Sequence, residues 1–177
     1  MTGTRPGTEL RDTLIRQFDI AWQLTSYHLT DLTTAECLWR PAARGLHLRQ
    51  DSSGTWHGEW PDHEGYDLGP PSLGWITWHM LFWWSMTLDD CFSAGTLTRE
   101  AVCWPGDADA VRGQLDRLRE TWLARLDALH DGDLRDTART RWPVQDRPFA
   151  DVVAWVNIEL TKNAAELGYG RFLHAVR

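Results

Sequence analysis

The sequence contains a single lysine, Lys162, and no cluster of basic residues. Its 18 lysines and arginines are outnumbered by 25 aspartates and glutamates, which gives a formal charge of −7. Recognition of a phosphate backbone needs a basic surface, because the bound side chains must neutralise phosphate charges. The composition therefore predicts that the protein does not bind nucleic acid.

Cysteine is also scarce, with Cys37, Cys91 and Cys103 in unrelated contexts and none of them in a CxxC pair. An odd number of cysteines without such spacing predicts neither a disulfide framework nor a zinc ribbon. The first residues have no apolar run of the kind found in secretory signals. These observations together favour a reducing, cytoplasmic location.

Long apolar runs and the sequence signatures of several enzyme classes are missing as well. The longest apolar stretch, residues 73–88, is interrupted by His79 and Ser85 and is shorter than the roughly 20 residues that a membrane-spanning helix needs. No nucleophile elbow, phosphate-binding glycine loop, HExxH helix or dinucleotide fingerprint occurs. Membrane insertion, hydrolysis by a serine triad and nucleotide chemistry are therefore not expected.

Tryptophan is abundant, with 12 residues in a chain of 177 that is 42% hydrophobic and 11% aromatic. This quantity of bulky apolar side chain can offset the conformational entropy lost on folding, and the length suits one hydrophobic core. We therefore expect a single domain over residues 1–177. Four of the tryptophans, at positions 75, 78, 83 and 84, surround His79 in the sequence.

Apolar residues recur every three or four positions in four long segments, which predicts four long helices at about residues 8–30, 72–90, 108–129 and 149–174. Gly132 is expected to end the third of them, and a capping box at residues 33–36 predicts a short extra helix. Alternating residues around a turn predict a β-hairpin over 46–60, followed by a loop over 61–71. The predicted fold is all-α, a four-helix bundle with a small β-hairpin between its first two long helices.

The helical periodicity places His79 at the centre of a heavy aromatic face, flanked by Trp75 and Trp83, while Thr77 and Leu81 fall on the opposite face. Two interpretations of His79 are open. It is either a core histidine whose nitrogens bond a carbonyl or hydroxyl group, or a ligand in a functional pocket.

On the last helix, Glu159, Asn163 and Glu166 follow one edge of the buried face. Buried carboxylates are costly unless they pair, bind a metal or face a wet cavity. The alternative is that both glutamates turn toward solvent while Asn163 bonds a neighbouring backbone group. The periodicity leaves both alternatives open.

Three segments resemble the DinB/YfiT-like superfamily of metal-dependent proteins, and the likeness extends over nearly the whole chain. They are residues 38–41 (LWRP), 71–80 (PSLGWITWHM) and 155–168 (WVNIELTKNAAELG). The resemblance implies an up-down-down-up four-helix bundle that forms a homodimer. It also implies a divalent cation, commonly zinc or nickel, held by three histidines, and activity as a thiol transferase, isomerase or hydrolase on low-molecular-weight thiol conjugates.

Carried over by position, the ligand on the second long helix matches His79, and the two histidines of the last helix fall on Glu159 and Asn163. Glu166, one turn further, is the candidate third ligand. An amide oxygen suits zinc and nickel poorly and shifts the preference toward harder ions such as manganese. The expected cofactor is therefore zinc, nickel, manganese or iron. The competing outcome is that metal binding has been lost.

The resulting hypothesis makes His79 and Glu159 catalytic through a metal-activated thiol or water. Trp75 and Trp83 would line the substrate pocket, and His63, on a loop that also carries His57, Asp62 and Glu64, would cover its mouth. The second hypothesis is a non-catalytic bundle with a degenerate metal site, which binds a small apolar ligand or acts through dimerisation.

Overall fold

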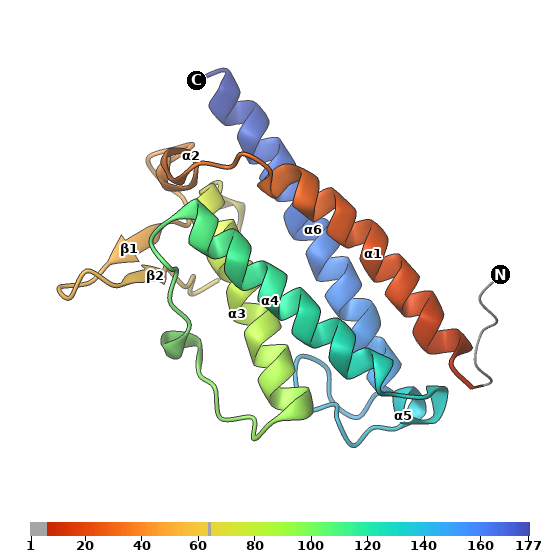
Figure 1. The fold of residues 1–177 in the computed structure, drawn as a ribbon. Helices are drawn as coiled ribbons and strands as arrows, with labels where there is room; N and C mark the ends of the chain where they lie inside the picture. The colour runs from red at the N-terminus through yellow and green to blue at the C-terminus, as the bar shows by residue number, and fades with distance from the viewer. Residues whose placement is uncertain (1–6, 64) are drawn as a thin grey trace.

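The computed structural model describes residues 7–63 and 65–177 and is drawn as a ribbon in Figure 1. The long helices are α1 (Glu9–Leu29), α3 (Leu73–Phe92), α4 (Ala108–Asp127) and α6 (Phe149–Ala175). The shorter elements are the helices α2 (Thr34–Leu38) and α5 (Asp131–Arg135), the strands β1 (Leu48–Gln50) and β2 (Trp56–Gly58), and the 3-10 helices η1 (Tyr66–Leu68) and η2 (Arg99–Ala101). The prediction of a mostly helical protein with one small antiparallel hairpin is confirmed.

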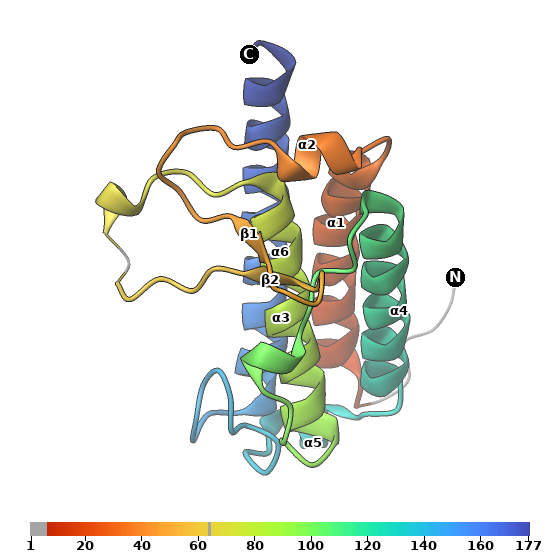
Figure 2. The same cartoon turned by 90° about the vertical axis from the view of Figure 1, so that its left-hand side faces the viewer.

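The long helices pack around one hydrophobic core. α1 packs against α6 and α4, and α3 packs against the same two helices. Figure 2 shows the hairpin and the loop that follows it on one side of this group. The core is rich in indole rings, since Trp78, Trp83, Trp84, Trp104 and Trp122 are all buried. The unusual tryptophan content is therefore mainly a property of the core.

Local signals in the sequence set the beginnings of α2 and α3. Thr33 Oγ1 accepts the Glu36 N–H at 3.2 Å while Glu36 Oε2 accepts the Thr33 N–H at 2.9 Å, which is the predicted capping box. Ser72 Oγ accepts the Trp75 N–H at 3.2 Å at the start of α3. Both predicted starts are confirmed.

The predicted end of the third long helix at Gly132 is wrong. α4 ends at Asp127, and Gly132 lies inside the short helix α5. The reason is a contact from the other end of the sequence: Arg11 of α1 donates hydrogen bonds at 2.9 Å to the carbonyl oxygens of Asp127 and Leu129. These bonds satisfy carbonyl groups that the end of the helix leaves open. Asp131 of α5 in turn accepts the Arg11 N–H at 3.1 Å.

The face of α3 opposite His79, which carries Thr77 and Leu81, is buried as well. The segment after η2 helps to cover it, because Trp104 Nε1 donates to Thr77 Oγ1 at 3.0 Å. Trp78 Nε1 also donates to the Val102 carbonyl at 2.7 Å. α3 is thus enclosed by long helices on one side and by irregular segments on the other.

The β-hairpin sits directly on α3 and is held there from two sides. Trp56 of β2 forms an antiparallel bridge with Trp104, whose N–H donates to the Trp56 carbonyl at 2.9 Å. A Cβ added to Gly58 would lie 2.0 Å from the ring of Trp78. This position therefore needs glycine, because the hairpin backbone lies directly against a buried indole.

Among the helices formed by residues 7–63 and 65–177, none combines the length and the apolar composition that crossing a membrane requires.

Candidate functional site

His79 lies half-buried on α3 beneath an aromatic cover. The Trp75 ring stacks on the imidazole with centroids 5.0 Å apart and planes 10° apart, and Phe82 lies 6.2 Å away. His79 Nδ1 is buried and has no hydrogen-bond partner among the described residues. Burial, and to a lesser extent the Lys162 charge, lower the pKa of His79 to about 4 against the opposing effect of a hydrogen bond with Asn163. The imidazole is therefore neutral at pH 7.

Asn163 on α6 is fully buried and links two other side chains. Its Oδ1 accepts the Trp83 Nε1–H at 2.8 Å, and its Nδ2 donates to Glu166 Oε2 at 2.9 Å. The three residues form a continuous chain from α3 to the half-exposed edge of α6. A buried amide needs partners on both its oxygen and its nitrogen, and Asn163 has both.

Glu159, one turn before Asn163, is paired with the only lysine of the chain. Its Oε2 lies 2.8 Å from Lys162 Nζ, and the Glu159 side chain is 16% exposed against 45% for Lys162. The carboxylate charge is thus balanced within its own helix. We call His79, Trp83, Glu159, Asn163 and Glu166 the α3–α6 polar cluster.

The donor set of this cluster does not fit the predicted metal. Within residues 7–63 and 65–177, no three side chains of histidine, cysteine, aspartate or glutamate are placed to hold one ion. Glu159 faces Lys162, and Glu166 and the oxygen of Asn163 are bound to groups within the cluster. Zinc and nickel prefer three or four imidazole, thiolate or carboxylate ligands around one point, which the cluster does not offer.

A cavity of about 760 Å³ lies between the hairpin, the loop that follows it and η2. His63, predicted to cover a pocket at His79, lines this cavity instead, together with Asp62 and His57. Its lining includes none of the α3–α6 polar cluster, nor Trp75, whose Nε1 donates to the Glu59 carbonyl at 2.6 Å. Glu64 lies outside the described residues.

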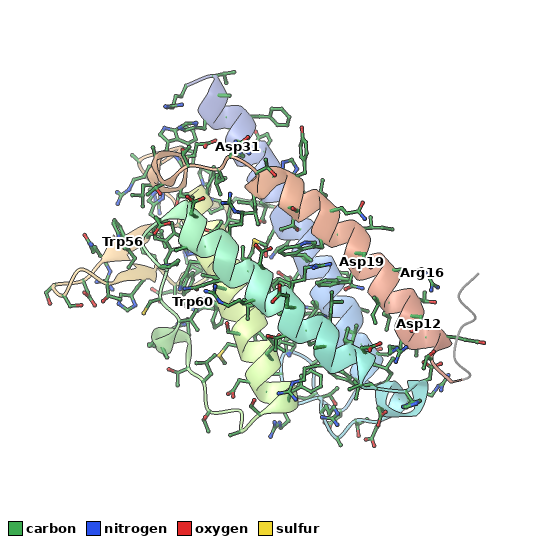
Figure 3. The ribbon with its side chains drawn as sticks, viewed as in Figure 1. Asp12, Arg16, Asp19, Asp31, Trp56 and Trp60 are labelled. Carbon is green, nitrogen blue, oxygen red and sulfur yellow. The ribbon has the colours of Figure 1, made fainter. Side chains whose placement is uncertain are left out.

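One wall of the cavity is aromatic. Trp60 meets Trp78 edge to face at a centroid distance of 6.3 Å, and Arg99 lies over the Trp60 ring at 4.7 Å. Figure 3 labels Trp56 on the hairpin and Trp60 beyond it, toward the helices. Trp60 is 47% exposed, so its ring is accessible to a ligand. An exposed ring of this kind offers a stacking surface for a planar group.

The charges around the cavity are mostly paired. Arg99 bonds Glu100 at 2.6 Å, and Asp51 bonds His57 at 3.0 Å. Arg49 on β1 is exposed, and its side chain has neither an ion pair nor a hydrogen bond with any residue that the structure describes. Its guanidinium therefore remains available to a ligand.

Sequence reasoning did not identify Arg49, Trp60 or Arg99 as binding residues. For Arg49, the alternating pattern of the hairpin sequence was a usable signal. It places Arg49 on one face of β1, and in the observed register this residue faces His57 of β2. The position of Arg99 could not be inferred, because η2 reaches the hairpin only through the folded path of the chain.

Residues 17–167 match the DinB superfamily, which is most of the chain. No curated protein and no solved structure matches it. The extent of the match agrees with a helical protein whose long helices share one core, and the chain belongs to the DinB superfamily.

Proposed function

We propose that the protein binds a small planar or aromatic anion in the hairpin cavity, and that the α3–α6 polar cluster is a structural centre. The observation that carries the proposal is the combination, in one cavity, of an exposed indole with an arginine that has no partner among the described residues. Pockets of this size typically bury most of a small ligand and use a few polar groups to orient it.

The lining carries four carboxylates, from Asp51, Glu59, Asp62 and Glu100, against two arginines, so the preference for an anion rests on the Arg49 side chain, which has no partner among the described residues. Arg49 presents a planar guanidinium that can bond both oxygens of a carboxylate or sulfonate. The carboxylate of Glu59 accepts the His47 N–H at 3.1 Å, which leaves Asp62 as the one other lining charge without a partner among the described residues. Removal of Asp62 should therefore strengthen anion binding, whereas removal of Arg49 should weaken it.

The test uses 8-anilinonaphthalene-1-sulfonate, a fluorescent aromatic sulfonate. Arg49→Ala should weaken binding of this probe by about tenfold, the effect of losing one charge-assisted hydrogen bond. Asp62→Asn should bind more tightly than the wild type. Arg16→Ala is the matched control, because Arg16 is an exposed arginine on α1, far along the bundle from the hairpin (Figure 3).

The proposal fails if the folded protein does not bind the sulfonate. It also fails if Arg16→Ala weakens binding as much as Arg49→Ala, because attachment would then depend on net charge alone.

The structural role of the polar cluster is supported by the bonds of Asn163 with Trp83 and Glu166 and by the pairing of Glu159 with Lys162. Plasma mass spectrometry of protein purified without a chelating tag should find much less than one metal ion per chain. Adding manganese, iron, nickel or zinc should not raise this value. Stoichiometric metal that disappears in His79→Ala would instead favour the metal-dependent thiol transferase, isomerase or hydrolase expected from the resemblance.

We also infer that the long helices form an up-down-down-up bundle. The colour gradient of Figure 1 supports this order, since α1 and α6 run toward the same end of the molecule and α3 and α4 run away from it. In this order α1 and α6 are parallel neighbours, and the chain between them supplies the two antiparallel helices α3 and α4.

A homodimer through α1 and α6 is part of the proposal. These two helices pack together and carry exposed large apolar side chains, including Ile20, Tyr27, Ile158 and Phe172. Clustered apolar groups on a soluble surface typically mark an interface. Sedimentation velocity should give a dimer for the wild type and a monomer for the double variant Ile20→Glu, Ile158→Glu, and a wild-type monomer would contradict this assignment.

A further inference from the structure

Three residues from separate parts of the chain meet beside the hairpin cavity. Trp56 and Trp104 face each other in an antiparallel bridge, so one step along each chain places His57 next to Cys103. On its other side, His57 of β2 faces Arg49 of β1. Cross-strand neighbours share one face of a sheet, which explains why an arginine, a histidine and a cysteine form a row here.

The row is completed by a carboxylate. Cys103 Sγ lies 4.0 Å from His57 Nδ1, and His57 Nε2 lies 3.0 Å from Asp51 Oδ2. The other oxygen of Asp51 accepts the Ser53 N–H at 2.8 Å and the Thr55 N–H at 3.0 Å. The turn of the hairpin thus holds the carboxylate of Asp51 through Oδ1, which leaves Oδ2 to bond His57.

These contacts determine which imidazole nitrogen carries the proton. Hydrogen bonds from Ser53 and Thr55, and from His57, hold the pKa of Asp51 well below its usual range, so the group is ionised and only accepts. In the neutral form of His57, the hydrogen bond to this carboxylate places the proton on Nε2, toward Asp51. Nδ1 of that tautomer is the free acceptor, 4.0 Å from the Cys103 thiol, which also donates to the Ala101 carbonyl at 3.9 Å and must turn from it to give its proton to a general base.

Cys103 differs from the other two cysteines in accessibility. Cys103 is half-buried, while Cys37 and Cys91 are buried in the core. Burial, together with the neighbouring carboxylates of Glu36 and Asp90, raises the pKa of each buried thiol to about 12. A reagent that requires a thiolate should therefore distinguish Cys103 from both.

We propose that Cys103 is the nucleophile, His57 the general base and Asp51 the positioning residue of a site that hydrolyses small esters held in the hairpin cavity. The inference rests on the proposed function, because the cavity supplies the ester. Asp51, His57, Arg49 and Val102 line that cavity, and Cys103, which is not in the lining, adjoins it through Val102 and His57. The cavity favours an aryl ester with an anionic group, the class that Trp60 and Arg49 together accommodate.

The reaction proceeds in two steps. Cys103 Sγ attacks the ester carbonyl carbon and gives its proton to His57 Nδ1; a sulfur–carbon bond forms, the carbon–oxygen bond breaks, and the leaving alcohol takes the proton from His57. Water then attacks the thioester while His57 accepts one of its protons and returns it to the sulfur. The products are one acid and one alcohol per ester and water consumed, with no change in oxidation state.

The test treats the full chain with p-nitrophenyl acetate and follows both p-nitrophenolate release and the acetyl group on each cysteine peptide by mass spectrometry. Acetylation should fall on Cys103, with Cys37 and Cys91 unlabelled, and Cys103→Ser should abolish it. His57→Gln should slow acetylation about 100-fold, the usual contribution of a general base. His130→Gln is the matched control, because His130 is an exposed histidine that does not line the cavity, and it should react as the wild type does.

Asp51→Asn tests the positioning role without removing the turn, because an amide oxygen can still accept from Ser53 and Thr55 while its nitrogen faces His57. The amide should drive the His57 proton to Nδ1, which nitrogen NMR shifts of the imidazole would detect, and acetylation should slow as in His57→Gln. Equal acetylation rates in the wild type and His57→Gln would overturn the inference, even where the sulfonate binds. His57-dependent acetylation without sulfonate binding would overturn only the proposed ligand class of the cavity.

Discussion

The α3–α6 polar cluster and the hairpin cavity both contact α3, but their polar groups are used in opposite ways. In the cluster, Trp83, Asn163 and Glu166 bond one another within or at the edge of the core. At the cavity, Arg49 has no partner among the described residues, and Cys103 and His57 face each other near solvent. Burial makes an unpaired polar group costly, and the groups open to a ligand at the cavity lie where water reaches them, whereas His79 Nδ1 is a buried exception within the cluster.

The largest expected difference between the regions is the pH dependence of stability that His79 contributes. Its pKa is about 4 in the folded protein against 6.5 as the ordinary value, so the unfolded chain binds the proton first as the pH falls. The contribution of His79 to the free energy of unfolding is therefore fully present above pH 6.5. It is lost between pH 6.5 and pH 4, by about 3 kcal/mol in total. Urea unfolding across this range measures the loss.

The comparison variant for this measurement is His79→Gln, which cannot titrate. Burial also lowers the pKa values of His28 and His47, so the wild type and the variant share their contributions, and the difference between the two pH profiles isolates His79. If stability depended on pH in the same way in the wild type and in His79→Gln, the pKa of His79 would not be lowered by burial as described.

Removing the central amide should have the next largest effect. Asn163→Ala leaves the buried Nε1–H of Trp83 without its acceptor and should lower the free energy of unfolding by about 2 kcal/mol. Trp83→Phe removes the donor, and the double variant should cost less than the two single changes added together. Strict additivity in denaturant unfolding would mean that the two side chains do not interact.

A change where the two regions touch should have an intermediate effect. Gly58→Ala forces a Cβ into the buried ring of Trp78 and should destabilise the protein by about 1–2 kcal/mol while weakening sulfonate binding. Gly132→Ala in α5 is the matched control, because a Cβ there meets nothing within 4 Å, and it should leave stability unchanged or slightly raised. An unaffected Gly58→Ala would mean that the hairpin is not seated on α3 as described.

The smallest effect on stability is expected at the cavity itself. Arg49→Ala removes an exposed side chain without described partners and should change the free energy of unfolding by no more than about 0.5 kcal/mol. The same variant should lose most of its sulfonate binding. A large loss of stability would show that Arg49 supports the hairpin, and the contrast between the two regions would disappear.

Most of the secondary structure followed from local patterns. Apolar spacing located the four long helices, and the residues at Thr33 and Ser72 fixed the starts of α2 and α3. The exception was the end of α4, where Arg11 from the far end of the chain overrides the signal of Gly132. A helix end can be read from sequence only when its open groups are satisfied locally.

The candidate site was predicted less completely. The face of His79 with Trp75 was visible from the helical period, because stacking partners four residues apart share one face. The helical period could also have predicted the pairing of Glu159 with Lys162, since residues three positions apart are neighbours on a helix. The bond between Trp83 and Asn163 was not, because it depends on how α3 and α6 are rotated against each other.

The sequence by itself determined that this is a tryptophan-rich helical protein of the DinB superfamily with one hairpin insertion, because composition, periodicity and family pattern are properties of the chain. Only the tertiary structure decided that Asn163 bonds both Trp83 and Glu166, and that Cys103 lies beside His57. The physical reason is that hydrogen bonding and proton transfer depend on distances between side chains remote in sequence, which only the packing of the elements sets.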